Sequence, residues 1–412
     1  MNENRRKFLI QAGQGLTAFF TLGEKVFPST PFKMENTIES EEGKLHEVES
    51  AGTPYEIGRQ YSGTLGDIFT NHVKTSVEGL SNQFSKDPMH KALDFMLNGL
   101  RRDFPYLVEE MRGMADGAKL TFEEVALTNL GAGLAAFIKN KGDRKSDCGC
   151  PSGQGFDNRI QRIDGCTNIL FPRSDHGPIM GRTLDASIPR VGTDIVRWIR
   201  PKKGYALLCV SRTNGLSTVH GINEKGLGVG EASLHFPTIN PKGIIRNILP
   251  RLLLQECTTV EQGIRFLSKF PVLRHGFHYT LVDGNGHAAV VERSPTEMVA
   301  RRSKDKPVFC TNHAATPSMR KLELSRGTTG DKNSDARYAR LQSLVSSPDF
   351  EMTLHQMKSM LQDHRVPGGI CQHGDLDMYT QRAFLALVNE KKLLVTNGPA
   401  CRHEYKEYRL KG

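Results

Sequence analysis

The chain has 412 residues, of which 38% are apolar and 24% charged, and its formal net charge at pH 7 is +10. This is the composition of an ordinary globular protein long enough for one large domain or two modest ones, and nothing in it indicates disorder or internal repeats. Lysine and arginine are scattered along the chain and only one tryptophan is present, so we expect no nucleic-acid partner.

The N-terminal residues 1–35 differ from the rest of the chain. Asn4 to Ile10 includes a pair of arginines, and a mild apolar run follows from Leu16 to Leu22. This pattern resembles a twin-arginine export signal, which predicts a periplasmic or extracellular protein. The apolar run is too short to span a bilayer, so we expect no integral membrane segment. No cleavage site is clear before Pro28, so a basic tail on a cytoplasmic protein stays the alternative.

The next part of the chain, 36 to about 145, reads as mainly helical. Pro88 to Arg102 carries apolar residues at helical spacing, and Pro105 to Met114 continues as a second helix after a break. Thr121 to Glu124 forms a capping box that opens a third helix, which we expect to run to Ile138.

Beyond residue 165 the apolar period changes from helical to strand-like. Strands are predicted at 167–171, 205–211, 216–222, 227–233, 279–282, 288–292, 383–388 and 393–396. Helices that cover these strands are predicted at 244–256, 260–268 and 354–362. The inventory fits an α+β protein with two antiparallel sheets sandwiched between helix layers.

The dipeptide Gly165-Cys166 offers a nucleophile that can carry its own base. A thiol attacks as thiolate, and at an ordinary pKa of about 8.5 little thiolate exists at neutral pH without a nearby base. If the bond before Cys166 were cut, the freed α-amino group, with a pKa of about 8, could accept the thiol proton. Gly165 lets the carbonyl approach the thiol at little steric cost. This is the logic of an N-terminal nucleophile hydrolase.

Motifs around and after this cysteine resemble those of choloylglycine hydrolase and penicillin V acylase. They occur in the family order: Cys166 to Ile169, Gly181 to Asp185, Gly221 to Gly228 and Cys310 to His313. The flanking motifs resemble one branch, the acyl-coenzyme A:6-aminopenicillanic acid acyltransferase family. These are Pro54 to Gly58 with Gly63, Glu109 to Ala115, Asp363-His364, and Ile370 to His373.

The resemblance implies a four-layer αββα N-terminal nucleophile fold and three parts of the chain. These are a signal or tail at 1–35, a helical pro-segment or α-chain at 36–165, and a catalytic β-chain at 166–412. It also implies self-cleavage between Gly165 and Cys166 and an α/β heterodimer as the product.

Carried over residue by residue, the resemblance implies five catalytic residues. Cys166 would be the nucleophile, and Arg182 and Asp185 would orient and tune it. Asn312 would donate its side-chain amide to the oxyanion, and Arg337 would match a later arginine near the nucleophile, although its spacing differs by one residue from that of the choloylglycine relatives.

One departure concerns substrate binding. Where these relatives carry Leu-Asn-Phe-Pro, this chain has Leu234 to Pro237, with His235 in place of the asparagine. An imidazole replaces an amide and can titrate near neutral pH. We expect His235 and Phe236 to line the substrate pocket.

Each of these residues can also be interpreted as having a purely structural role. Cys166 can be a small buried hydrophobe, and Arg182 and Asp185 a surface ion pair beside a hairpin. Asn312 can be a turn residue, and Arg337 can belong to a solvated helix face.

Other motifs do not indicate a metal or a cofactor, and we expect neither. Cys148 and Cys150, and the group His364, Cys371 and His373, lack the paired spacing of a structural zinc site. Residues 327–333 look superficially like a phosphate loop but lack its Gly-Lys-Ser/Thr ending, and we expect a flexible loop there.

The sequence therefore predicts a self-processed cysteine amidohydrolase or acyltransferase that acts on a small amide or acyl thioester. Hydrolysis and transfer share the acyl-enzyme and differ in whether water or an amine resolves it, with hydrolysis slightly favoured. An acyl-coenzyme A-dependent N-acyltransferase, or a binding protein that kept the fold without processing, stays the alternative.

Overall fold

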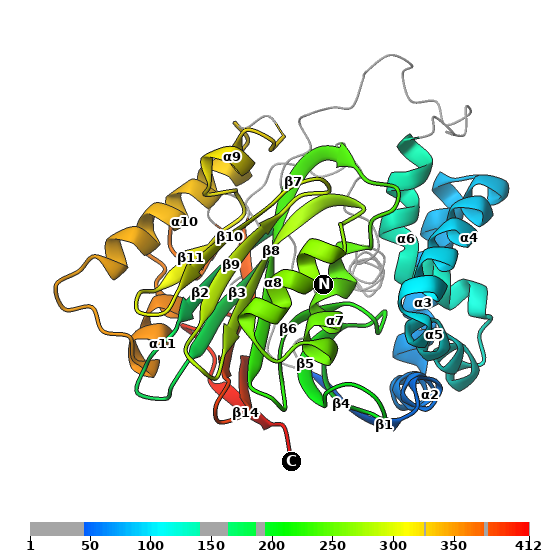
Figure 1. The fold of residues 1–412 in the computed structure, drawn as a ribbon, viewed down its shortest axis with the longest axis horizontal. Helices are drawn as coiled ribbons and strands as arrows, with labels where there is room; N and C mark the ends of the chain where they lie inside the picture. Colours follow the sequence, from blue (N-terminus) through cyan, green and yellow to red (C-terminus); the bar gives the residue numbers. More distant parts are fainter. Residues whose placement is uncertain (1–44, 141–163, 187–193, 325–326, 375–377, 412) are drawn as a thin grey trace, which may run out of the picture.

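The computed structural model of the protein describes residues 45–140, 164–186, 194–324, 327–374 and 378–411. Two β-sheets pack face to face, and helices cover the outer face of each sheet (Figure 1). This confirms the predicted α+β sandwich of four layers. The predicted signal or tail at 1–35 and the pair Cys148 and Cys150 lie outside the described residues.

The first sheet has eight strands. Their order is β1 (His46–Gly52), β4 (Asp194–Pro201), β5 (Leu207–Arg212), β6 (Thr218–Asn223), β7 (Leu227–Ile239), β8 (Arg274–Asp283), β9 (Ala288–Arg293) and β10 (Met298–Ser303). All neighbours are antiparallel except β1 and β4, which run parallel. The prediction of two purely antiparallel sheets is therefore wrong at this edge, and the segment expected to be mainly helical contributes a strand.

The second sheet has six strands, all with antiparallel neighbours. Their order is β11 (Val308–Cys310), β2 (Asp164–Phe171), β3 (Ile179–Ala186), β12 (Tyr379–Leu387), β13 (Lys392–Thr396) and β14 (Tyr405–Arg409). Within it, β2 and β3 form a hairpin that carries Cys166 and Arg182. Between the sheets lies an apolar cluster to which both contribute, including Leu170, Met180, Val196, Leu208 and Phe384.

On the side of the first sheet, the described part of the chain forms α2 (Pro54–Leu65), α3 (Asp67–Gln83), α4 (Lys86–Asp103), α5 (Pro105–Ala118), α6 (Phe122–Asn140), α7 (Leu249–Glu256) and α8 (Val260–Lys269). Of these, α3 and α4 pack on other helices. The capping box predicted before α6 is present, because the backbone N–H of Glu124 donates to Thr121 Oγ1 and the Glu124 carboxylate accepts from the Thr121 N–H. The helix predicted at 244–256 begins later, after a short 3-10 turn η1 (Arg246–Ile248), with a proline in its first turn.

One buried charge cluster joins this helix layer to the first sheet. Glu110 of α5 lies 3.2 Å from Arg197 of β4 and 3.4 Å from Arg251 of α7. All three side chains are almost fully buried. Helix α5 is thus fixed to the sheet by charge as well as by apolar packing.

The outer face of the second sheet carries α10 (Thr329–Val345) and α11 (Leu354–Gln362), and the short α9 (Pro317–Arg320) lies beside them (Figure 1). Thr328 caps α10 and forms a capping box with Asp331. The prediction of a flexible loop at 327–333 is therefore wrong, because a threonine three residues before an aspartate satisfies the first N–H groups of a helix.

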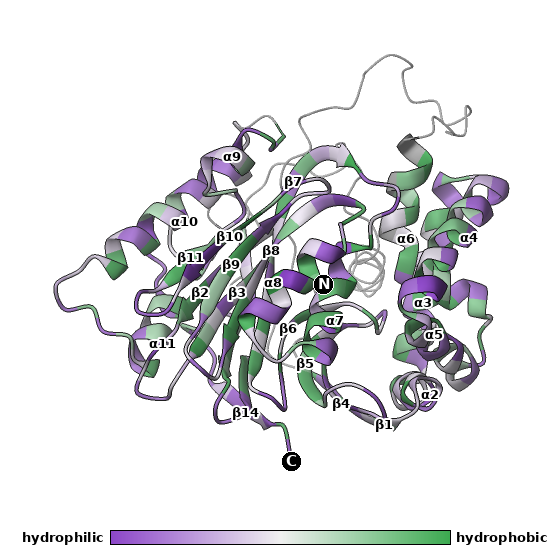
Figure 2. Ribbon diagram, viewed as in Figure 1, coloured by the Kyte–Doolittle hydropathy of each residue, from purple (hydrophilic) through white to green (hydrophobic). Residues whose placement is uncertain are grey.

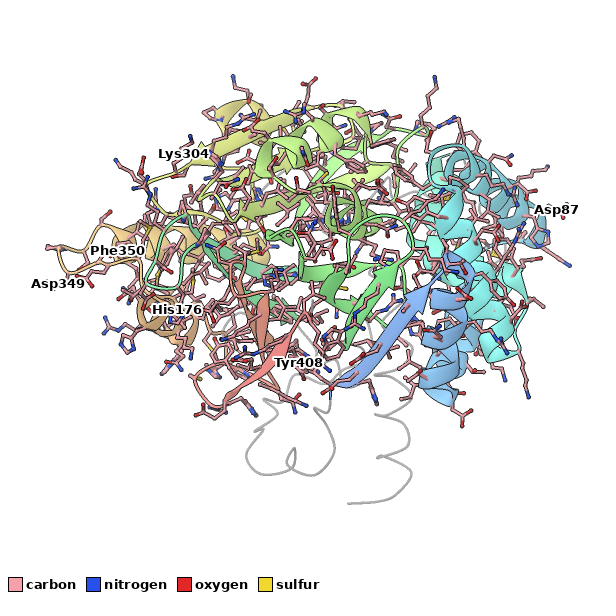
Figure 3. The ribbon with its side chains drawn as sticks, turned by 60° about the horizontal axis from the view of Figure 1, so that its bottom comes forward. Asp87, His176, Lys304, Asp349, Phe350 and Tyr408 are labelled. Carbon is pink, nitrogen blue, oxygen red and sulfur yellow. The ribbon has the colours of Figure 1, made fainter. Side chains whose placement is uncertain are left out.

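Hydropathy follows these layers. Strands in the middle of the molecule are mostly apolar along their length, whereas the helices carry polar residues on their outer faces (Figure 2). Charged side chains such as Asp87, Lys304 and Asp349 stand at the outside of the molecule (Figure 3). Within the described ranges, no helix combines the length and apolarity that a membrane span requires.

Candidate active site

Gly165 and Cys166 lie near the start of β2, the second strand from the edge of the second sheet. Strand β3 pairs with them, so that Gly165 faces Asp185 and Cys166 faces Leu184 in the ladder. A Cβ at position 165 would lie 2.4 Å from Met378 Cε and 2.9 Å from Asp185 Cβ. A side chain at this position would displace Met378 or Asp185, whereas the role predicted for Gly165 in cleavage stays a prediction.

Every polar atom of Cys166 contacts a side chain from another part of the fold. Its backbone N–H donates to Asn312 Oδ1 at 2.8 Å, and its carbonyl accepts from Arg337 Nη1 at 2.7 Å. Its Sγ lies 3.3 Å from Arg182 Nη2. Cys166 is 4% exposed, so the residue is buried and held at three points.

Arg182 of β3 places a positive charge beside this thiol. Its side chain is fully buried and forms an ion pair with Glu231 of β7 at 2.9 Å, and it also donates to the carbonyl of Val219. The alternative of a surface ion pair between Arg182 and Asp185 is wrong, because both are buried and the acidic partner of Arg182 is Glu231.

The thiol of Cys166 is not activated by its surroundings alone. Burial raises its pKa above the ordinary value, and the positive charge of Arg182 lowers it less than burial raises it. The intact chain therefore holds the neutral thiol at physiological pH, next to a cation that can stabilise the thiolate once a base removes the proton.

Asp185 lies beside Gly165, and its charge also acts on the thiol of Cys166. Its carboxyl accepts hydrogen bonds from Thr380 at 2.7 Å and from Thr183 at 3.2 Å. Burial raises its pKa to about 6, although Arg337 and Thr380 act in the opposite direction. Asp185 thus titrates close to neutral pH, at the bond that would be cut.

Asn312, which follows β11, is buried and oriented by several partners. Its Oδ1 accepts from both Cys166 N–H and Arg337 Nη2, and because an arginine can only donate, this fixes which end of the amide faces the nucleophile. Its Nδ2 donates one hydrogen to the carbonyl of Ser233 at 3.3 Å. The second amide hydrogen is the one on which the predicted oxyanion role depends, and that role stays a prediction.

Arg337 projects from α10 into the site. It is fully buried, so the alternative of a solvated helix face is wrong. Besides Cys166 and Asn312, it contacts Thr167 Oγ1 at 2.9 Å and Asn333 Oδ1 at 2.7 Å. A guanidinium with this many partners fixes the backbone of the nucleophile relative to α10.

His235 and Phe236 lie further along β7. Phe236 is fully buried in a small apolar cluster with Leu234, Ala314 and Met319, and the ring of His235 lies 5.3 Å from that of His275. Phe236 therefore has a core position. Substrate binding by these two residues stays a prediction.

Three residues that hold the site were missed from the sequence: Glu231, Thr380 and Ser334. An acidic residue in the glycine-rich apolar strand Leu227–Ile239 was a signal for Glu231, because a buried carboxylate requires a partner. Ser334 accepts from the backbone N–H of Asn312 at 2.8 Å. Neither Ser334 nor Thr380 stands out from the many other hydroxyl residues in the sequence.

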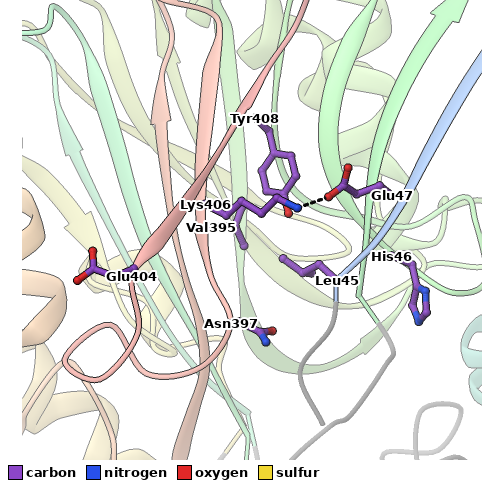
Figure 4. Close-up of a pocket in the computed structure, with 8 residues that line it drawn as sticks. All are labelled: Leu45, His46, Glu47, Val395, Asn397, Glu404, Lys406 and Tyr408. Atoms are coloured by element: carbon purple, nitrogen blue, oxygen red, sulfur yellow. Dashed lines mark hydrogen bonds and ion pairs between the residues drawn. The ribbon is translucent and has the colours of Figure 1, made fainter. Parts of the chain in front are cut away.

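One pocket opens where the edges of the two sheets meet. Its walls come from β1 and the residue before it, from β13 and β14, and from the turn between those two strands, and Lys406 forms an ion pair across it with Glu47 (Figure 4). Tyr408, which also lines it, lies close to β1 (Figure 3). None of the predicted site residues lines this pocket.

Several solved structures are similar to this chain. Penicillin V acylase from Agrobacterium tumefaciens is 16% identical over 56% of this chain and 82% of its own, with a TM-score of 0.35. A variant of the conjugated bile acid hydrolase from Clostridium perfringens is 16% identical over 60% and 97%, with a TM-score of 0.35. The Caenorhabditis elegans ortholog of N-acylethanolamine-hydrolyzing acid amidase is 12% identical over 60% and 100%, with a TM-score of 0.39.

A protein family also matches the chain directly, over residues 173–372. This range contains Arg182, Asp185, Asn312 and Arg337, and it begins after Cys166. The match supports an enzyme that acts on acyl groups. The resemblance found in the sequence is confirmed: residues 173–372 match the acyl-coenzyme A:6-aminopenicillanic acid acyl-transferase family.

Proposed function

We propose that the protein cuts itself between Gly165 and Cys166 and then acts as a cysteine N-terminal nucleophile amidohydrolase or acyltransferase. The single observation that carries the proposal is the arrangement around Cys166. Its nitrogen, carbonyl and sulfur are held by Asn312, Arg337 and Arg182, respectively. A buried cysteine that served only packing would not require three charged or amide partners.

The proposed self-cleavage proceeds through a thioester. The Cys166 sulfur attacks the Gly165 carbonyl carbon, the bond from that carbon to the Cys166 nitrogen breaks, and the nitrogen takes up the proton that the thiol has lost. Water then hydrolyses the thioester. The products are a carboxylate at Gly165, the regenerated thiol and a free α-amino group on Cys166.

In the mature enzyme this amino group is the base that the intact chain lacks. It takes the thiol proton, and the thiolate attacks the carbonyl of a small amide or thioester. Arg182 stabilises the thiolate, and Asp185, beside the new chain end, stabilises the ammonium form of the amine. A second hydrogen on Asn312 Nδ2 is the proposed donor to the oxyanion, a contribution of about 10²–10³ in rate.

The packing supports a heterodimer as the product of cleavage. Strand β1 stays paired with β4, and Tyr61 of α2 donates a hydrogen bond to the carbonyl of Thr213 at 3.0 Å. Both contacts join residues before the cut to residues after it.

The first experiment measures the intact mass and N-terminal sequence of the purified protein. We expect two chains, one beginning Cys-Thr-Asn-Ile, from the wild type and from Cys209→Ala, which removes another buried thiol. Cys166→Ala should stay a single chain. A wild type that also stays intact would refute self-processing and favour a binding protein.

A second experiment separates hydrolysis from acyl transfer. The processed enzyme is incubated with small amides and acyl thioesters, with and without an amine acceptor. Release of free acid without an acceptor supports the hydrolase. An acyl-coenzyme A-dependent N-acyltransferase, the second candidate suggested by the family match, would instead form an N-acyl product only when an amine is present.

A further inference from the structure

Histidine and cysteine side chains gather at a second place, on the outer side of the second sheet. His364 follows α11, Cys371 and His373 lie in the loop that leads to β12, and Cys401 lies in the turn between β13 and β14. The ligand atoms of His364, His373 and Cys401 all lie within 4.8 Å of one another. The geometry points to a structural zinc site with these three ligands. Cys371 lies outside this group, but its Sγ is close to that of Cys401, and we take it as the fourth ligand, brought in by a side-chain rotation when the ion binds.

The distance between the two sulfur atoms matches that between two thiolate ligands of one tetrahedral zinc ion, and the neighbouring imidazole is close enough to join them. The Sγ atoms of Cys371 and Cys401 are 3.7 Å apart, and His373 Nε2 lies 3.1 Å from Cys401 Sγ. Two thiolates bound at about 2.3 Å to one tetrahedral zinc ion lie roughly 3.8 Å apart. Both cysteines are free thiols.

The histidine at the surface is already oriented to bind through one nitrogen. The Nδ1 atom of His364 lies 3.0 Å from the carbonyl of Gln362. A carbonyl accepts only from an N–H, so this contact places the proton on Nδ1 and leaves the Nε2 lone pair for a metal. A backbone carbonyl behind a histidine is the usual support for a zinc ligand.

The backbone around the cluster is held in place without a metal. The Cys371 N–H donates to the Asp363 carbonyl at 2.8 Å, and Gln362 Nε2 donates to the Ala400 carbonyl at 3.1 Å. Cys371 is buried, whereas His364 is exposed. An ion can therefore enter from the His364 side and meet ligands whose backbone is already in place.

The ligand types select the ion. Two thiolates and two neutral imidazoles neutralise one divalent ion, and sulfur with imidazole favours zinc over magnesium or calcium, which prefer oxygen ligands. The sequence spacing did not reveal the site because Cys401 is distant in the chain and reaches the other ligands only through the β12–β13 hairpin.

The proposed ion would also support the site around Cys166. Gln372 stands between two ligands, accepts from Asn333 Nδ2 at 2.7 Å and donates its N–H to Thr380 Oγ1 at 2.8 Å. Asn333 contacts Arg337, and Thr380 contacts Asp185. The metal is thus expected to act as a positioning element, and its existence does not depend on the proposed function.

The test measures zinc in the full-length protein, purified with a reducing agent and without chelators. We expect about one zinc ion per chain, and cobalt in its place should give tetrahedral absorption with a thiolate charge-transfer band. Cys401→Ser and His364→Ala should weaken zinc affinity at least about tenfold. The controls Cys257→Ser and His355→Ala, which alter a buried thiol and an exposed imidazole outside the cluster, should bind as the wild type does.

Cobalt titration of the wild type needs no variant, so a variant that fails to fold leaves the test intact. Wild-type protein that takes up neither ion, or cobalt spectra without a thiolate band, would overturn the proposal. So would a Cys371–Cys401 disulfide in the protein as purified, together with no metal uptake after reduction. Self-cleavage is scored separately by intact mass, so a failure of the proposed function does not affect this result.

Discussion

The two helix layers of the sandwich make different contributions to the site. The layer on the first sheet is large and contacts the sheet through apolar side chains and the buried Glu110 cluster. The layer on the second sheet is smaller, yet its α10 supplies Arg337, Asn333 and Ser334 to the network around Cys166. Stability and positioning of the nucleophile are therefore expected to depend on different layers, and mutations can separate them.

The largest expected effect lies in the first layer. Glu110→Ala leaves two arginines buried without their carboxylate, which should lower the free energy of unfolding by about 3–5 kcal/mol. Chemical denaturation measures this free energy. Glu109→Ala, which removes an exposed pair with Arg112, should change stability by less than about 1 kcal/mol. The rate of self-cleavage per folded molecule should stay unchanged in both variants. Slower self-cleavage in the Glu110 variant alone would show that the first layer also positions the nucleophile.

Arg337→Lys tests the second layer. A lysine cannot reproduce the forked contacts to Cys166, Thr167 and Asn312, so we expect self-cleavage to slow by about 10²–10³, as for loss of a group that stabilises the transition state. Single-turnover cleavage followed by intact mass measures the rate. Arg340→Lys, one turn further along α10, serves as control. Equal rates in both variants, with equal melting temperatures, would contradict a positioning role.

The ionisation of Asp185 should make the stability of the fold depend on pH. Because its folded pKa of about 6 lies above the ordinary value of 3.8, this carboxyl stabilises the fold below pH 4 and loses that contribution as the pH rises through 6. The shift of roughly two units corresponds to at most about 3 kcal/mol. Asp185→Asn should therefore gain stability relative to the wild type between pH 4 and pH 7, measured by denaturation at each pH. A constant difference would show that Asp185 is ionised throughout.

The smallest expected change in stability comes from removing either of two matched helix caps. Thr121→Ala and Thr328→Ala each remove the threonine of a capping box, at a cost of about 1 kcal/mol. Only the second cap holds the first turn of α10, so only Thr328→Ala should also slow self-cleavage. Slower cleavage in the Thr121 variant at equal loss of stability would argue against separate roles for the two layers.

Local signals predicted much of this fold. The capping box at Thr121, the helical period before it and the covering helix at 354–362 needed only short-range information, and the structure confirms them. Strand β1 was missed because it is short, polar on one side and pairs in parallel with β4, more than 140 residues away in the sequence. Nothing within such a segment distinguishes an edge strand from a loop.

The candidate site was likewise predictable only in part. The residues taken from the resemblance, from Cys166 to Arg337, come together in space, but their partners were not foreseen. The sequence cannot show that Glu231 rather than Asp185 pairs with Arg182, because that depends on which strands of the two sheets face each other. The orientation of the Asn312 amide likewise depends on Arg337, which comes from a distant helix.

The position of strand β1 affects how the protein refolds after denaturation. An uncut chain refolds as one molecule, at a rate that does not depend on its concentration. Once the bond before Cys166 is broken, the edge strand and its helices belong to a separate polypeptide, and restoring the β1–β4 ladder becomes an encounter between two solutes. Recovery of the folded protein after denaturation would then slow on dilution, because the two chains must associate before the sheet is complete.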